Sequence, residues 1–228
     1  MSNIEYTNED CMAGMARYPD KHFDLAIVDP PYGIKDLIVN GGEKGRRLNV
    51  AKGLAKFDFV PSKKYFEELF RISKNQIIWG GNYFVEHLRH SRGWIVWDKN
   101  FPPNFTFAKA ELAYTSFNVN LEIFKLSAWL EKHDYHPTQK PVALYKWLLK
   151  NYAKQGDLIL DTHVGSASSL IACYDMGFDA VGFELDADYY KESKQRLDDF
   201  MRQPRIEQIV QENKEQIDMF DRPDYSKP

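Results

Sequence analysis

The chain has little cysteine, no long apolar run and no excess of positive charge. Its two cysteines, Cys11 and Cys173, lie far apart and lack metal-ligand spacing, which argues against a disulfide framework and a cysteine-based zinc site. No stretch approaches the roughly 18 consecutive apolar residues of a membrane span, and the polar start lacks the pattern of a signal peptide. We therefore expect a cytoplasmic protein that uses no metal and does not contact a membrane.

The 228 residues are enough for one full α/β domain. A hydrophobic fraction of 43% with 28% charged residues excludes a disordered chain and a coiled coil. The net charge is -3, so a polyanion such as nucleic acid needs a local basic patch. Residues 35–64 provide one, because eight cations face three acids there, for a net charge of +5.

Short apolar runs alternate along the chain with amphipathic stretches, which is typical of a sheet covered by helices. The runs predict seven strands, at Ile4–Glu9, Leu25–Asp29, Gln76–Gly80, Trp94–Asp98, Leu112–Phe117, Leu158–Asp161 and Ala180–Glu184. The amphipathic stretches predict helices at Met12–Tyr18, Pro61–Ile72, Asn82–His90, Pro141–Ala153, Ser166–Met176 and Ala187–Met201. We expect a single domain over residues 1–201, with a mobile basic loop at 34–60. We expect residues 202–228 to form a polar tail with a short helix at Ile206–Phe220.

The strongest local signal is Asp29-Pro30-Pro31-Tyr32, directly after an apolar strand. An acid at the carboxyl end of a strand lies where open α/β sheets place their ligands, and the two prolines make the turn rigid. The carboxylate and a backbone carbonyl are acceptors suited to an exocyclic amino group, and the tyrosine ring offers a face for stacking a planar base. The alternative is a capped turn with a packed tyrosine.

A second element follows the strand that ends at Asp161, where a turn with Gly165 and Ser166 leads into a helix. Small residues let the backbone approach a ligand, and a helix start favours an anion. Glu184 comes about 20 residues later at the end of the next strand, the position that accepts hydrogen bonds from ribose hydroxyls in nucleotide-binding folds. His163 in this turn either stacks on a ligand or fills space.

A third element runs from His136 to Pro141 and opens a helix. Its polar residues Thr138, Gln139 and Lys140 are suited to a carboxylate, with the lysine as the charged partner. The alternative is a solvated helix start.

These motifs together resemble those of the S-adenosylmethionine-dependent DNA amino-methyltransferases, which methylate adenine N6 or cytosine N4. The Asp-Pro-Pro-Tyr run matches the family's catalytic motif, and Asp161, Gly165 and Ser166 match its cofactor motif, Asp-Pro-Phe-x-Gly-Ser-Gly-Thr. Three positions depart from that cofactor motif, namely Thr162, His163 and Ala167. The catalytic motif precedes the cofactor motif, which resembles the circularly permuted order of the beta group. The resemblance covers roughly residues 4–200.

The resemblance implies a seven-stranded, mostly parallel Rossmann-like methyltransferase sheet with one reversed strand and helices on both faces. Asp29 and Asp161 would then end adjacent strands and face one cleft. The implied catalytic residues are Asp29, Pro30, Pro31 and Tyr32. The implied binding residues for S-adenosyl-L-methionine are Asp10, Cys11, Asp29, Thr138, Gln139, Lys140, Asp161, His163, Gly165, Ser166 and Glu184.

The reaction implied is methyl transfer to the N6 amino group of a flipped-out adenine in DNA, because cytosine N4 enzymes of the family more often begin the catalytic motif with serine. The expected phosphate contacts are Lys35, Lys44, Arg46, Arg47, Lys52, Lys56 and Lys99. Target recognition falls to residues 117–136, a region so short that it indicates a brief recognition sequence or help from a second subunit. A homodimer and a paired restriction endonuclease are the partners left open besides DNA.

Three other hypotheses compete with this one. N4-cytosine or RNA methylation uses the same fold and would be recognised by the modified nucleoside. A catalytically silent methyltransferase fold that binds nucleic acid is compatible with the altered cofactor motif, although the residues that match the family's catalytic and cofactor acids are present. A nicotinamide dehydrogenase is disfavoured because no G-x-G-x-x-G follows the first strand.

Overall fold

The structure is a computed structural model that describes residues 2–33, 58–102, 108–127 and 139–203. Most of the expected basic loop lies outside these ranges, as do residues 128–136 of the expected recognition region, Thr138 and the tail helix. Within the described part of the chain, no helix is long and apolar enough to cross a membrane.

The described residues form one mixed sheet with the strand order β1-β8-β7-β2-β3-β5-β4-β6. The strands are β1 (Ile4–Asn8), β2 (Phe23–Val28), β3 (Ser73–Trp79), β4 (Trp94–Asp98), β5 (Ala110–Thr115), β6 (Glu122–Lys125), β7 (Leu158–Asp161) and β8 (Asp179–Glu184). Only β5 runs antiparallel to its neighbours β3 and β4, and every other pairing in this sheet is parallel. The predicted fold class with one reversed strand is confirmed, and so is the pairing of the first strand with the last.

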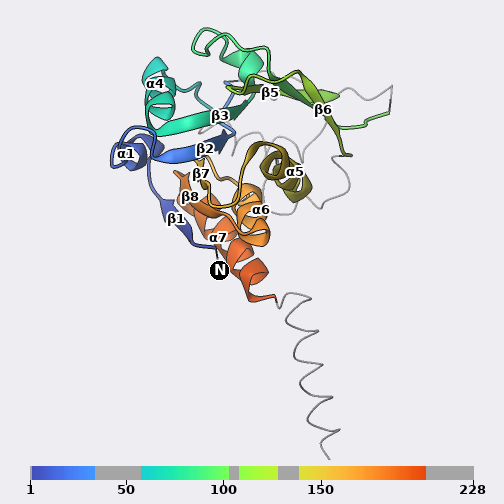
Figure 1. Ribbon diagram of the computed structural model, residues 1–228. Coiled ribbons are helices and arrows are strands. Elements are labelled where there is room, and N and C mark those ends of the chain that lie inside the picture. Colours follow the sequence, from blue (N-terminus) through green and yellow to red (C-terminus); the bar gives the residue numbers. More distant parts are fainter. Residues whose placement is uncertain (1, 34–57, 103–107, 128–138, 204–228) are drawn as a thin grey trace, which may run out of the picture.

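Helices cover both faces of the sheet (Figure 1). They are α1 (Cys11–Met15), α4 (Lys63–Ile72), α5 (Val142–Tyr152), α6 (Ser168–Met176) and α7 (Ala187–Arg202), with the short 3-10 helix η1 at Gly81–Tyr83. α1 and α4 pack on one face, and α5, α6 and α7 pack on the other. Because β2 is buried from both sides, its residues from Leu25 to Val28 form a continuous apolar run, and that run is what made the strand predictable.

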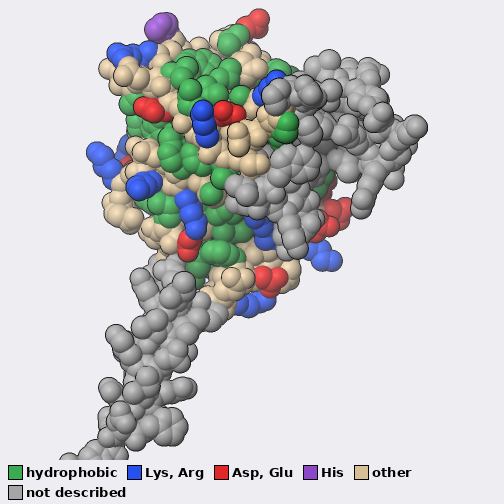
Figure 2. Space-filling model, turned by 90° about the vertical axis from the view of Figure 1, so that its right-hand side faces the viewer, with side chains coloured by type: hydrophobic (Ala, Val, Ile, Leu, Met, Phe, Trp, Pro, Cys, Tyr) green, Lys and Arg blue, Asp and Glu red, His purple; other side chains and the backbone are tan. Residues whose placement is uncertain are grey.

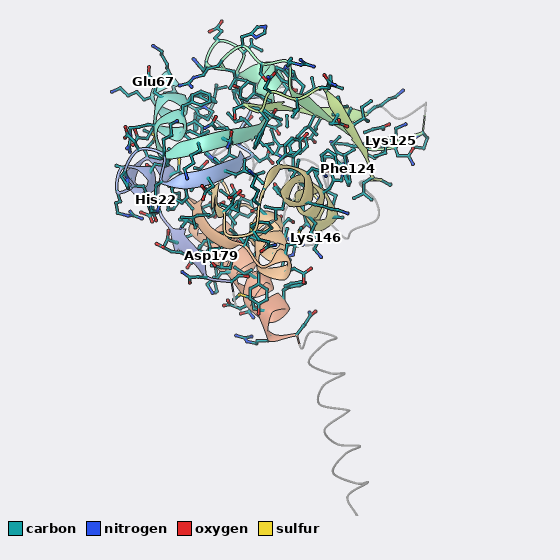
Figure 3. The ribbon with its side chains drawn as sticks, in the orientation of Figure 1. His22, Glu67, Phe124, Lys125, Lys146 and Asp179 are labelled. Atoms are coloured by element: carbon teal, nitrogen blue, oxygen red, sulfur yellow. The ribbon has the colours of Figure 1, made fainter. Side chains whose placement is uncertain are left out.

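Two elements differ from the sequence prediction. The expected helix Asn82–His90 is wrong, since only η1 forms there, entered through Gly80 in the left-handed region with a φ of 68°. The sheet has eight strands instead of seven, because β6 pairs with β4 along its edge. Phe124 of β6 packs on the Trp147 ring of α5 with centroids 5.2 Å apart, and Figure 3 shows this strand lying over α5.

The described surface carries charges of both signs. On the face shown in Figure 2, lysine and arginine side chains alternate with acids around a central area of apolar side chains. A surface of this kind does not by itself attract a polyanion, so nucleic-acid contacts have to come from local groups.

Candidate active site

The carboxyl ends of β2 and β7 lie side by side at the centre of the sheet. The two strands pair in parallel through Leu25 with Ile159 and Ala26 with Leu160. β2 ends at Val28 and β7 ends at Asp161, so Asp29 and Asp161 stand at the same edge. This confirms the predicted adjacency of the two acids.

Asp29 is held by a hydroxyl group and an ammonium group. Its Oδ1 accepts a hydrogen bond of 2.5 Å from the Tyr32 hydroxyl, and its Oδ2 accepts one of 2.5 Å from Lys140 Nζ. Lys140 Nζ also lies 3.2 Å from the Tyr32 hydroxyl oxygen. The carboxylate side chain of Asp29 is 21% exposed, so lone pairs on its oxygens stay accessible at the sheet edge.

Tyr32 lies against a glycine turn at the end of β3. A Cβ atom on Gly80 would come within 2.2 Å of the Tyr32 ring, so only glycine lets the ring lie there. One face of Tyr32 stacks on Tyr83, with centroids 5.0 Å apart and planes 13° from parallel. Tyr83 is 47% exposed. A base that stacks on Tyr32 therefore takes its other face or the place of Tyr83.

Asp161 is buried, and its carboxylate organises the turn that follows it. Oδ1 accepts from the His163 amide at 3.0 Å, and Oδ2 accepts from the Ser169 hydroxyl at 2.5 Å. Burial raises the pKa of Asp161 to about 7, against the lowering effect of these hydrogen bonds. The buried Asp161 carboxylate thus fixes the backbone path of the turn between β7 and α6.

Two of the three residues that depart from the family's cofactor motif, Thr162 and His163, are joined to α4. The Tyr65 hydroxyl and Thr162 Oγ1 share a hydrogen bond of 2.6 Å, and Thr162 Oγ1 lies 2.9 Å from His163 Nδ1. The Tyr65 ring also meets the His163 ring edge-on at 5.4 Å. Burial lowers the pKa of His163 to about 4, so the ring is neutral at neutral pH and acts as an aromatic group.

Glu184 lies at the end of β8 and ties two turns together. Its Oε2 accepts from the Gly165 amide at 2.9 Å, and its Oε1 accepts from the Asp186 amide at 2.9 Å. Burial raises the pKa of Glu184 above its usual value. Each carboxylate oxygen has a second lone pair, so the group can still accept hydrogen bonds from a ligand.

The turn at Gly165 leaves room for a ligand such as the adenosyl cofactor. Gly165 has a φ of 56°, and the nearest atom to a Cβ placed on it is a backbone oxygen 4.0 Å away. Leu185, next to Glu184, exposes 56% of its surface and offers an apolar contact. A carboxylate that can accept from hydroxyl groups, an open turn of small residues and an apolar contact together fit a nucleoside.

Asp10 and Cys11 sit where β1 leads into α1. Asp10 Oδ1 caps α1 by accepting from the Met12 amide at 2.9 Å and the Ala13 amide at 3.1 Å. Burial raises the pKa of the Cys11 thiol to about 12, so the thiol is neutral. Their predicted cofactor contacts stay predictions.

The described part of the third motif, which starts at Gln139, brings Lys140 to the sheet edge that holds Asp29. Gln139 and Lys140 are buried just before α5, and Lys140 forms ion pairs with both Asp29 and Glu111. Its predicted contact with the cofactor carboxylate stays a prediction. Lys99, predicted to bind DNA, is 16% exposed and pairs with Glu111 at 2.5 Å. The other predicted DNA contacts, Lys35, Lys44, Arg46, Arg47, Lys52 and Lys56, lie outside the described residues.

Sequence reasoning missed Glu111, Tyr83 and Tyr65. Each is a single residue in an ordinary-looking strand, turn or helix, and each becomes notable only through partners more than 25 residues away or on another element. A signal existed only for Tyr83, which follows the glycine pair after β3.

Comparison with solved structures identifies the fold first. The PvuII DNA methyltransferase, described as cytosine-N4-specific, matches with a TM-score of 0.61 at 11% identity, over 88% of this chain and 92% of that one. A complex of M1.HpyAVI with SAM matches with a TM-score of 0.55 at 19% identity, over 85% and 98%. The chain therefore has the Rossmann-like methyltransferase fold.

Comparison by sequence then shows the family. The sequence model of the N6/N4 DNA methylases matches residues 23–195, so the chain belongs to this DNA methylase family. Type II methyltransferase M.HpaI of Haemophilus parainfluenzae is 36% identical over 63 residues, which is 28% of this chain and 20% of that protein. DNA adenine methyltransferase YhdJ of Escherichia coli is 33% identical over 69 residues, 30% and 24% of the two chains. The matched segment thus spans about a quarter or less of these two relatives.

Proposed function

We propose that this protein transfers a methyl group from S-adenosyl-L-methionine to the N6 amino group of a flipped-out adenine in DNA. The observation that carries the proposal is the Asp29 carboxylate at the carboxyl end of β2, placed beside the open turn after β7. An amino-group acceptor and a nucleoside-type site thus share one edge of the sheet. Membership in the DNA methylase family supports the same reaction class.

The catalytic task is to make a poor nucleophile react. The lone pair of an adenine amino group is delocalised into the ring, so the enzyme has to localise it on nitrogen. The Asp29 carboxylate and the Pro30 carbonyl accept the two N–H bonds and favour tetrahedral nitrogen. Bound cofactor supplies an electrophilic methyl group on sulfur. Transfer of this methyl group would form the new N–C bond at the expense of the sulfur–methyl bond, and Asp29 would take up one amino proton along its hydrogen bond. Positioning and electrostatics account for the acceleration.

The residues that would hold the cofactor surround the turn after β7. Glu184 would accept from the ribose hydroxyls, and the backbone at Gly165 and Ser166 would approach the ligand closely. Neutral His163 would present an aromatic face. Both cysteine thiols have pKa values raised by burial, so no thiolate nucleophile is assigned here and no covalent enzyme intermediate is needed.

Adenine is favoured over cytosine because the catalytic motif begins with aspartate. N4-cytosine methylation is the second candidate, since a cytosine-N4-specific enzyme has the same fold. A silent binding module is disfavoured because the five motif residues Asp29, Tyr32, Lys140, Asp161 and Glu184 are all present. Three of them, Asp29, Tyr32 and Lys140, contact one another, and Asp161 ends the neighbouring strand. A cytoplasmic location, a second subunit and a paired endonuclease stay predictions.

The test is incubation of the purified protein with methyl-labelled S-adenosyl-L-methionine and unmethylated bacterial DNA, followed by mass spectrometry of the digested nucleosides. We expect N6-methyl-deoxyadenosine. Label on N4 of deoxycytidine would keep the mechanism and overturn the base. Absence of both label and cofactor binding would overturn the proposal and support the silent module.

A further inference from the structure

Four charged side chains form a row of alternating sign that ends at the catalytic aspartate. Asp29 Oδ2 lies 2.5 Å from Lys140 Nζ, which lies 3.0 Å from Glu111 Oε2. Glu111 Oε1 in turn lies 2.5 Å from Lys99 Nζ. The Lys140 side chain is only 4% exposed, and the Glu111 side chain is 22% exposed. Two negative and two positive charges therefore balance within a largely buried group.

Four separate elements deliver these side chains to one place. Asp29 follows β2, Lys140 precedes α5, and Glu111 lies near the start of β5, where it pairs in register with Trp97 of β4. Lys99 comes directly after β4. Because β5 is the reversed strand, its beginning lies at the edge where β2 and β4 end. The reversal of β5 is what brings Glu111 to the catalytic edge.

Glu111 has no part in the mechanism described so far, yet burying a carboxylate is costly unless it is paired. Its ion-pair partners in the described chain are Lys140 and Lys99. Burial raises the pKa of Glu111, but the charges of Lys140 and Lys99 outweigh it and lower the pKa to about 2. Burial likewise lowers the pKa of Lys140, and the charges of Asp29 and Glu111 outweigh it and raise that pKa. Both groups are therefore charged at neutral pH.

The Lys140 ammonium group contacts two carboxylates, and the contact with Glu111 determines the geometry of the contact with Asp29. With Glu111 on its far side, Lys140 Nζ contacts Oδ2, while Oδ1 accepts from Tyr32. Without Glu111, nothing on the far side fixes the direction from which the ammonium group contacts Asp29, so it is free to swing around the carboxylate and occupy the lone pairs that the amino group needs. The role of Glu111 is then to fix the side from which Lys140 contacts Asp29.

We propose that Glu111 is a positioning residue for methyl transfer, which acts through Lys140 to fix the orientation of the Asp29 carboxylate. The inference rests on the proposed function and adds to it a residue outside both the catalytic and the cofactor motifs. Lys99 balances the charge of Glu111 from the opposite side.

The first test is steady-state kinetics of the full chain with labelled S-adenosyl-L-methionine and DNA. Glu111→Gln removes the charge and keeps the shape, Glu111→Asp keeps the charge, and Glu68→Gln is the matched control. Glu68 on α4 pairs with Arg71 at 2.6 Å and has a side chain 23% exposed, close to the 22% of Glu111. We expect Glu111→Gln to lower kcat by about 10- to 100-fold with both KM values nearly unchanged, because geometry in the transition state is lost. Glu111→Asp should recover part of the rate, and Glu68→Gln should match the wild type.

The second test measures the titration of Lys140 directly and does not depend on enzymatic turnover. In ligand-free protein labelled at the lysine ε-carbons, the Lys140 signal is assigned by its loss in Lys140→Met and titrated by NMR. The titratable groups around it are Asp29, Tyr32, Glu111 and, behind Glu111, Lys99, with Tyr145 of α5 close to both acids. Loss of the Glu111 charge should shift the Lys140 titration to lower pH, and Glu68→Gln should leave it in place.

The outcomes separate the two proposals. If the wild type and Glu68→Gln transfer methyl groups and folded Glu111→Gln does so at the same rate, Glu111 has no positioning role and the proposed function stands. An unchanged Lys140 titration in Glu111→Gln would also overturn the inference. A wild type that methylates no DNA would overturn the proposed function, and the positioning role would fall with it. If Glu111→Gln does not fold, Glu111→Asp is the variant that tests the positioning role. Its side chain is one methylene shorter and keeps the charge, so kcat should fall without a large change in the Lys140 titration.

Discussion

Asp29 and Asp161 occupy equivalent places and have opposite environments. Each stands at the carboxyl end of a central parallel strand, and the two strands are neighbours. Asp29 is partly exposed and contacts an ammonium group and a phenol. Asp161 is 2% exposed, and the groups that hydrogen-bond to it are a backbone amide and a hydroxyl. The position in the fold is shared, but the charge around each acid is not.

The difference shows that local partners decide the role of a strand-end acid. A carboxylate beside a buried lysine presents its remaining lone pairs to a ligand, whereas a carboxylate surrounded by neutral donors is used up in shaping a turn. Asp161 belongs to the second kind, because burial among neutral donors raises its pKa to about 7. We therefore expect the two acids to respond differently to substitution and to pH.

The largest effect should come from Asp29→Ala. Removing the acceptor for the amino group should lower methyl transfer by about 10³-fold or more, because transition-state stabilisation is lost. Labelled methyl incorporation measures the rate, while circular dichroism and cofactor calorimetry check that fold and binding persist. Asp24→Ala, on the same strand at the opposite edge, is the control and should stay active. Near wild-type transfer by Asp29→Ala would disprove the mechanism.

A smaller loss is expected for Gly80→Ala, which acts on the Asp29 side through Tyr32. The new Cβ would overlap the Tyr32 ring, and the φ of 68° is strained for alanine. We expect methyl transfer to fall by about 10- to 100-fold and the unfolding free energy to fall by about 1–2 kcal/mol. Gly156→Ala is the control, since its φ is 91° but its Cβ would meet nothing within 4 Å. Urea unfolding should show a loss of stability in both variants, since both glycines have a positive φ, and kinetics should show a loss of activity only in Gly80→Ala, where the Cβ also meets Tyr32.

Asp161→Asn should change the pH dependence of stability more than the rate. With a pKa of about 7 when folded and about 3.9 when unfolded, the folded state binds more protons between these pH values. The contribution of Asp161 to stability therefore falls as pH rises from about 4 to about 7. The wild-type stability minus that of Asp161→Asn, from urea unfolding at several pH values, should decrease over this range. A flat difference would show that Asp161 is not protonated in the fold.

The smallest effect should come from His163→Phe, two residues away. The His163 pKa of about 4 when folded and about 6.5 when unfolded means that the unfolded state binds more protons in this window. The contribution of His163 to stability therefore rises with pH, opposite in sign to that of Asp161. The same unfolding series should show the opposite slope. Cofactor affinity should change by less than about threefold, and a larger loss would assign a polar role to the ring.

The sequence was sufficient where the physical signal is local. β4 and β7 begin and end at the predicted residues, since each is a short apolar run between turn residues. β6 was missed because it is a four-residue edge strand with mostly exposed side chains, and such a strand carries little hydrophobic pattern. Asn82–His90 resembled a helix in its residue types, yet the glycine pair before it leads into a 3-10 turn.

The site was predictable only as far as its motifs are contiguous. Asp29 and Tyr32 are neighbours in sequence, so their joint location followed directly from the motif. Glu111 and Lys140 are 29 residues apart on different elements, and nothing in a single sequence indicates that their side chains meet. The reversed β5 creates that contact, and strand direction is a property of the complete sheet.

The pairing of the first strand with the last also affects how the chain is made. β1 is one of the two edge strands of the described sheet and pairs with β8, with Ile4 opposite Ala180. During synthesis at roughly 5–20 residues per second, β1 therefore waits on the order of 10–35 s before its partner leaves the ribosome. The strands β2 to β6 are complete much earlier. The nascent chain thus has β2 to β6, which are contiguous in the sheet, available for pairing first, and β1 can pair only after β8 is made, so a chain truncated before β8 would keep an unpaired N-terminal strand.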